Sequence, residues 1–134
     1  MNVTLDRCFR GAYNNAITAI QLASSMGVDR AKNEPAYLAY FLQKDGLFDS
    51  QEATEITTNQ NPSKDLMMRF LIWSISMIAE KPKTPAELIE QIIFNSGMDA
   101  GQVDILELTE EQWVRDLFIQ YKQNQRWGIK WTLH

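Results

Sequence analysis

Residues 62–81, PSKDLMMRFLIWSISMIAEK, contain the longest apolar run of the sequence and decide the predicted fold. As a helix this stretch would be about 30 Å long, at 1.5 Å per residue. Asn61 suits the N-cap, Pro62 suits the first helical position, and Pro82 would end the helix. Its polar residues form one narrow strip on a helical projection, namely Asp65, Arg69, Ser76 and Glu80. Because so thin a strip leaves an apolar surface that must be covered, the sequence predicts a mainly α-helical domain around a central buried helix.

The N-terminal segment predicts a long amphipathic helix over Leu5 to Met26. Apolar residues recur there at helical spacing, and Gly27 is a suitable C-terminal stop. Gly11 falls on the polar side of this helix. A glycine inside a helix costs about 1 kcal/mol relative to alanine, and the sequence gives no packing reason for it.

Other segments complete a domain of five or six helices. Thr84, Pro85 and Glu87 form a capping pattern that predicts a helix ending at Gly97. Further helices are predicted from near Pro35 to before Gly46, over Ser50 to Thr58, and from Thr109 through Tyr121.

A small β element is expected near the C-terminus. Residues 103–108 are rich in branched side chains and predict a short strand. Residues 127–133 alternate apolar and other side chains with a period of two, which is typical of a half-buried strand. The two strands are expected to pair, with residues 2–5 as a candidate third strand, because two strands alone are marginally stable. The alternative is an all-α bundle in which the tail is extended but unpaired.

Length and composition indicate a single globular domain. The chain has 134 residues, and its apolar fraction of 45% argues against disorder. Cys8 is the only cysteine, so no disulfide can form within the chain, which favours a reducing compartment. The N-terminus lacks an apolar core of signal-peptide length, and the apolar run 70–79 is too short to span a bilayer. We therefore expect a soluble, cytoplasmic protein without a membrane partner.

The residue types that most enzymes need for covalent or metal chemistry are scarce. The only histidine is His134, the last residue, where a fraying terminus suits neither a general base nor a metal ligand. Serine or cysteine nucleophiles would therefore have no partner base, and a zinc site would lack ligands. Cys8 is interpreted as a buried, inert thiol. With no Gly-rich phosphate loop in the sequence, we expect a protein without catalytic residues or a cofactor.

Two pairs of glutamates provide an alternative. Glu87 and Glu90, like Glu107 and Glu110, are separated by three positions, a spacing that on a helix places both carboxylates on one face, although the second pair spans the predicted strand and the following helix cap. This ExxE pattern resembles the paired acidic motifs of all-α nucleotide pyrophosphatases. The resemblance implies that these four glutamates hold Mg²⁺ for nucleotide hydrolysis. Helix capping and surface charge are the simpler interpretation.

The distribution of charge points to a protein partner. The net charge is −4, and residues 85–116 contain eight acids against Arg115 alone. Such a segment is either a solvated face or a surface that steers a basic partner. The candidate partner-binding acids are Glu107, Glu110, Glu111 and Asp116. We expect a non-enzymatic acidic protein-binding module, in its most concrete form an inhibitor or immunity-type protein that neutralises a basic toxin or nuclease.

Two further features bear on partners. Ile72 lies in the polar strip of the central helix and Trp73 at its border, so the pair would form a small apolar binding patch if the strip faces water. The C-terminal strand would present a sheet edge, through which a structural subunit could self-associate. Arginine, lysine and tryptophan interleave in the tail, but the acidity of the domain argues against nucleic-acid binding.

Overall fold

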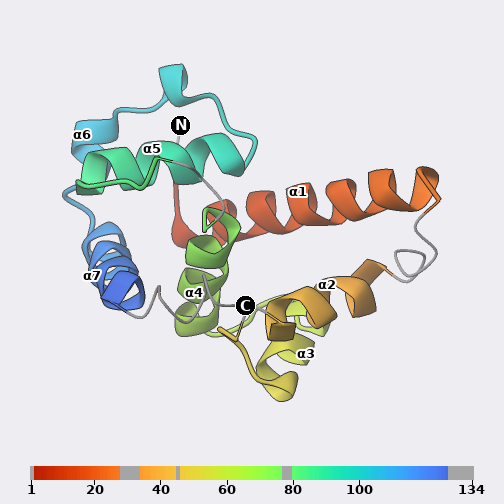
Figure 1. The fold of residues 1–134 in the computed structure, drawn as a ribbon. Helices are drawn as coiled ribbons and strands as arrows, with labels where there is room; N and C mark the ends of the chain where they lie inside the picture. Colours follow the sequence, from red (N-terminus) through yellow and green to blue (C-terminus); the bar gives the residue numbers. More distant parts are fainter. Residues whose placement is uncertain (1, 28–33, 45, 77–79, 127–134) are drawn as a thin grey trace.

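The computed structural model describes residues 2–27, 34–44, 46–76 and 80–126, without the side chains of 124–126, and these residues form an all-helical fold (Figure 1). The prediction of a mainly α-helical protein is confirmed, since the described residues contain seven α-helices, one 3₁₀ helix and no strand. The elements are α1 (Leu5–Ser25), α2 (Glu34–Lys44), α3 (Ser50–Thr58), α4 (Lys64–Ser74), α5 (Pro85–Asn95), η2 (Ala100–Gln102), α6 (Ile105–Leu108) and α7 (Gln112–Arg126).

Helix α4 lies at the centre, where α1, α3 and α7 pack around it (Figure 1). More than half of its residues are buried, namely Leu66, Met67, Met68, Phe70, Leu71 and Ile72. Complete burial of a side chain of this size stabilises the fold by about 1.5–3 kcal/mol. The buried central helix is therefore present, and its apolar surface is what the surrounding helices cover.

The described α4 is shorter than the predicted helix over 62–81. Its N-cap is Ser63, whose side chain accepts a hydrogen bond from the Leu66 N–H at 3.2 Å, so Pro62 lies before the cap rather than at the first helical position. At the other end the Ile75 N–H bonds to the Ile72 carbonyl at 3.3 Å. This bond spans three residues instead of four, the tighter pattern of a last helical turn. Residues 77–79 of the predicted helix lie outside the described residues.

The polar strip of α4 joins elements together. The Arg69 guanidinium bonds to Asp65 at 2.7 Å, to the Leu47 carbonyl at 3.1 Å and to the Glu52 carboxylate of α3. From α7, the Gln120 side-chain amide donates to Asp65 at 3.2 Å. Because a half-buried guanidinium must find several acceptors, this network connects α3, α4 and α7.

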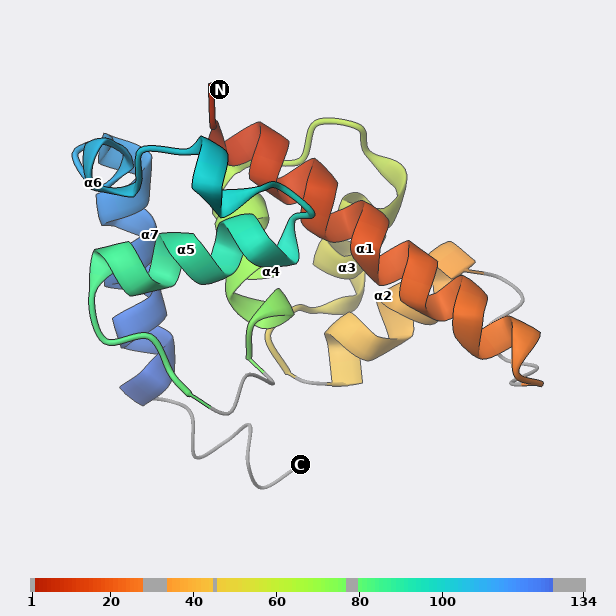
Figure 2. The same ribbon diagram turned by 90° about the horizontal axis from the view of Figure 1, so that it is seen from above.

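Gly11 allows α1 and α5 to meet closely (Figure 2). A Cβ atom at Gly11 would lie 2.3 Å from the Ser96 carbonyl oxygen. The buried Ser96 hydroxyl donates to the Cys8 carbonyl at 3.0 Å, and the Asn15 side chain donates to the Asn95 carbonyl. The glycine is thus required by packing against Ser96, a residue 85 positions further along the chain. Because glycine has no side chain, α1 comes close enough to supply hydrogen-bonding partners for the C-terminal end of α5.

The strand predicted over 103–108 is wrong. Asp104 caps α6 instead, accepting a hydrogen bond from the Glu107 N–H at 3.2 Å, and the Leu108 N–H bonds to the Asp104 carbonyl at 3.1 Å. These local bonds use the backbone groups that a strand would have to pair with a neighbour. The third strand expected over 2–5 is also wrong, because Thr4 is the N-cap of α1 and Leu5 its first residue. The strand predicted over 127–133 lies outside the described residues.

Candidate functional site

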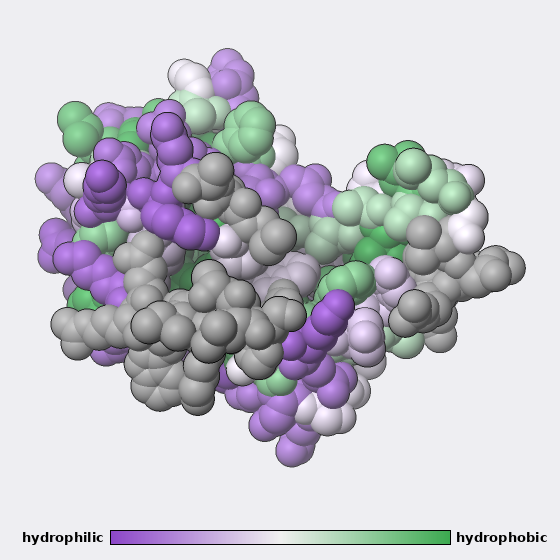
Figure 3. Space-filling model, viewed as in Figure 1, coloured by the Kyte–Doolittle hydropathy of each residue, from purple (hydrophilic) through white to green (hydrophobic). Residues whose placement is uncertain are grey.

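The candidate site is the acidic surface, defined here as Asp104, Glu107, Glu110 and Glu111. Asp104 is the N-cap of α6, Glu107 lies within that helix, and the other two occupy the turn that leads into α7. All four residues are exposed. Hydrophilic residues gather over the part of the molecule formed by α5, α6 and α7 (Figure 3). A single turn of helix and its flanking turn therefore bring four carboxylates to one exposed segment.

The carboxylates of this segment form no ion pair with any basic side chain that the structure describes. Ion pairs between described residues join Arg10 to Asp6, and Arg69 to Glu52 and Asp65. None of the eight acids between residues 85 and 116 forms such a pair with a described residue, and Arg115 is the only base in that segment. Uncompensated charges of one sign create a surface potential that attracts ligands of the opposite sign.

A hollow and an exposed apolar side chain accompany these acids. Asp104, Glu107 and Glu111 line a surface hollow of about 260 Å³, whose other wall includes Asn2 and Val3 of the segment that precedes α1. Leu106, on the single turn of α6, is 74% exposed. Protein-binding surfaces commonly combine an apolar centre with a polar rim, and the turn of α6 supplies both kinds of side chain.

The other predicted partner-binding residues, Asp116, Ile72 and Trp73, lie outside the acidic surface as defined here. Asp116 is half-buried in the first turns of α7 and accepts a hydrogen bond from the Gln112 side chain at 2.9 Å. Ile72 is only 1% exposed, because the surrounding helices cover α4, so the predicted patch with Trp73 does not form. Trp73 is half-buried, with its ring 5.4 Å from that of Phe70.

The four glutamates proposed as magnesium ligands have separate environments. Thr84 caps α5 as predicted, accepting from the Glu87 N–H at 3.1 Å, while the Glu87 carboxylate accepts from the Lys83 N–H at 2.7 Å. Glu90 lies exposed further along α5. Among the described residues, no three histidine, cysteine, aspartate or glutamate side chains come close enough together to hold a metal ion. The arrangement of Glu87, Glu90, Glu107 and Glu110 therefore gives the hydrolase alternative no support.

Cys8, on the inner face of α1, is completely buried. Burial raises the pKa of its thiol to about 12, an effect that the nearby Arg7 charge only partly offsets. A thiol with so high a pKa is a poor nucleophile because its thiolate is scarce at neutral pH. Its environment agrees with the interpretation of an inert core cysteine.

Sequence reasoning missed Leu106 and the capping role of Asp104, because it assigned both to a strand. A signal was present: an acceptor at 104 followed by Glu107 three positions later is a helix-start pattern.

None of the described helices is long and apolar enough to cross a membrane. In comparisons with known proteins, no family model, no curated protein and no solved structure matches this chain.

Proposed function

We propose that this protein is a non-enzymatic module that binds a basic protein partner through the acidic surface. The observation that carries the proposal is the set of exposed carboxylates on and beside α6, which pair with no described basic side chain. A partner with lysine or arginine side chains would supply the missing countercharge. Leu106 would provide an apolar contact at the same turn.

The most concrete form of this function is inhibition of a basic toxin or nuclease, as an immunity-type protein. Enzymes that act on nucleic acids carry positive charge where they contact phosphates. A compact acidic surface can occupy such a site in place of the phosphates. Complementary charge then raises the association rate and the specificity more than the affinity, which suits a protein that must reach its target quickly.

Site-specific photo-crosslinking tests where the partner binds. A crosslinking amino acid is placed at position 106 and, as a matched control, at position 94, since Phe94 on α5 is also highly exposed, at 77%. We expect one basic protein to be crosslinked in cell extract from position 106 and not from position 94. Crosslinking to the same proteins from both positions, or to no protein, would contradict the proposed surface.

The association kinetics of the captured partner test the electrostatics. Glu110→Lys/Glu111→Lys should slow association at low salt by about tenfold and flatten its dependence on salt. Glu80→Lys/Glu90→Lys is the control, because it makes the same change in net charge at exposed residues outside the acidic surface. Equal slowing by both variants would show that only net charge counts. A salt-independent rate in the unmodified protein would rule out steering by the acidic surface.

A further inference from the structure

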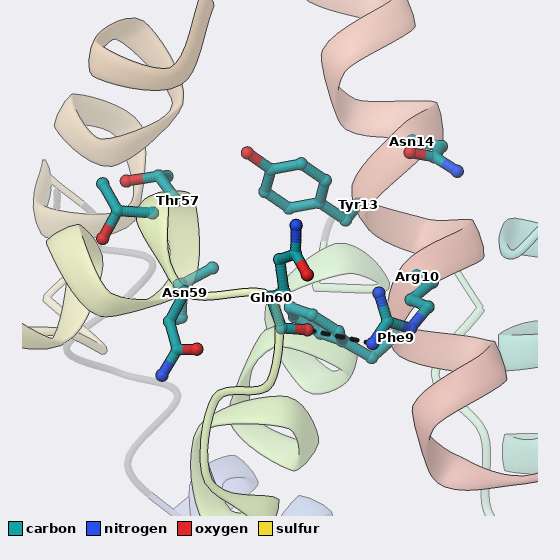
Figure 4. Close-up of a pocket in the computed structure, with 9 residues that line it drawn as sticks. Phe9, Arg10, Tyr13, Asn14, Thr57, Asn59 and Gln60 are labelled. Carbon is teal, nitrogen blue, oxygen red and sulfur yellow. Dashed lines mark hydrogen bonds between the residues drawn. The ribbon is translucent and has the colours of Figure 1, made fainter.

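A second surface feature lies between α1 and the end of α3, with the loop that follows it (Figure 4). This groove has a volume of about 290 Å³, close to the lower limit for sites that bind small molecules. Its apolar part is formed by Phe9 and Ile56, both buried, and by the half-buried Tyr13 ring, whose centroid lies 6.1 Å from that of Phe9. Two aromatic rings and an aliphatic side chain thus line the groove.

The cation at the rim of the groove, Arg10, already has three hydrogen-bond partners. Arg10 bonds to the Asp6 carboxylate at 3.0 Å, to the Gln60 carbonyl at 3.0 Å and to the Asn61 side-chain oxygen at 2.9 Å. These contacts fix the loop after α3 against α1, as the dashed bond in Figure 4 shows for Gln60. A ligand anion would have to compete with Asp6 for Arg10.

Neutral hydrogen-bonding groups in the groove remain available. The Tyr13 hydroxyl and the Gln60 side-chain amide form no hydrogen bond with any described residue. Figure 4 shows both side chains in the space between α1 and α3, with the Tyr13 hydroxyl directed toward α3. Together they offer donors and acceptors next to the aromatic floor, and the Tyr13 hydroxyl, whose pKa is raised by burial, is a neutral donor and acceptor.

We propose that this groove binds a small, uncharged ligand with a planar aromatic body and an amide edge. The planar body would pack on Phe9 and Ile56, and its amide would exchange hydrogen bonds with Gln60 and Tyr13. An anionic ligand would lose hydration and compete with Asp6 for Arg10, and a cationic one would meet no carboxylate among the described residues that line the groove. This site is independent of the acidic surface and of the proposed protein-binding function.

Three probes of nearly identical shape test the charge requirement: benzamide, benzoate and benzamidine. Each is titrated into the full-length ¹⁵N-labelled protein and followed by NMR. Benzamide should produce saturable shifts of the backbone signals of residues 57–60, with an affinity at least fivefold higher than that of either charged probe. Absence of saturable shifts, or binding of benzoate as tightly as benzamide, overturns the proposal. Shifts spread over the whole protein would indicate non-specific association and would overturn it as well.

Tyr13→Phe tests the hydrogen bond separately. The substitution keeps the ring that packs against Phe9 and Phe70 and removes only the hydroxyl, so the fold is retained. Loss of one hydrogen bond should weaken benzamide binding about fivefold. Tyr40→Phe is the control, because Tyr40 on α2 is exposed and does not line the groove, and it should leave the affinity unchanged. Equal affinities of Tyr13→Phe and the unmodified protein would overturn the assigned contact.

Discussion

Gly11→Ala provides a sensitive test of the contact between α1 and α5. The substitution adds one methyl group where the Ser96 carbonyl oxygen would be 2.3 Å away and the Ser96 Cβ 3.0 Å away. The nearest atom belongs to the backbone, so no change of side-chain rotamer can relieve the clash. The two helices must move apart, which stretches the hydrogen bonds from Ser96 to Cys8 and from Asn15 to Asn95.

Two opposing effects set the expected change in the free energy of unfolding. Alanine favours the helix over glycine by about 1 kcal/mol. Overpacking typically costs about 1–3 kcal/mol, and each weakened hydrogen bond adds up to about 1 kcal/mol. We therefore expect Gly11→Ala to destabilise the protein by about 2 kcal/mol, the balance of these three estimates. Without the contact, the same substitution would be stabilising.

Urea unfolding followed by circular dichroism measures this difference. Ala19→Gly, at an exposed position of the same helix, is the matched control and should lose about 1 kcal/mol through helix propensity alone. Ser96→Gly should not rescue Gly11→Ala, because the carbonyl oxygen remains in place. A Gly11→Ala variant as stable as the unmodified protein, or more stable, would refute the close approach of α1 and α5.

Three other predictions concern the described core and caps. Glu52→Gln should cost about 1 kcal/mol of unfolding free energy at neutral pH by weakening the bond to Arg69. This bond lowers the Glu52 pKa below its usual 4.5, so the stabilisation is present above pH 4.5 and is lost as the pH falls through the lowered pKa. In urea titrations at several pH values, the difference between the variant and the unmodified protein should disappear over that range. Cys8 should react with a thiol reagent far more slowly in the native protein than in urea, and rapid native labelling would contradict its burial. Asp49→Ala should lose about 1 kcal/mol in thermal unfolding by removing the capping box of α3, whereas no loss would mean that the cap is not formed.

The helices that the sequence predicted well begin and end at local signals. Asp49 or Ser50 before a polar first turn predicted α3, and the structure has that helix over Ser50–Thr58 with Asp49 as its cap. Thr84 followed by Pro85 likewise located the start of α5. Because a cap depends on residues within one turn, a single sequence contains the information that it needs.

Features that depend on distant residues were missed. The need for Gly11 arises at Ser96, and the polar strip of α4 is covered because Arg69 reaches Glu52 of α3. The strand predicted over 103–108 is wrong for another reason. Six residues are too few to distinguish the two-residue period of a strand from the 3.6-residue period of a helix, and the helix cap at Asp104 was overlooked.

The two candidate sites also differ in how much of each the sequence predicts. The excess of acids between 85 and 116 is visible in the sequence, but the exposure of Leu106 required the structure. The groove between α1 and α3 gave no sequence signal. Its free polar groups, Tyr13 and Gln60, are ordinary surface residue types, and only the fold places them together.

The contact of Cys8 with Ser96 joins positions 88 residues apart, which has a consequence for biosynthesis. The apolar face of α1 packs on α2, α4 and α5, so α1 completes its contacts only after α4 and α5, which lie further along the chain, have been synthesised. During that interval Phe9 and its neighbours are accessible to chaperones. A messenger RNA that stalls translation before codon 96 should therefore yield nascent chains that are readily bound by chaperones and cleaved by proteases.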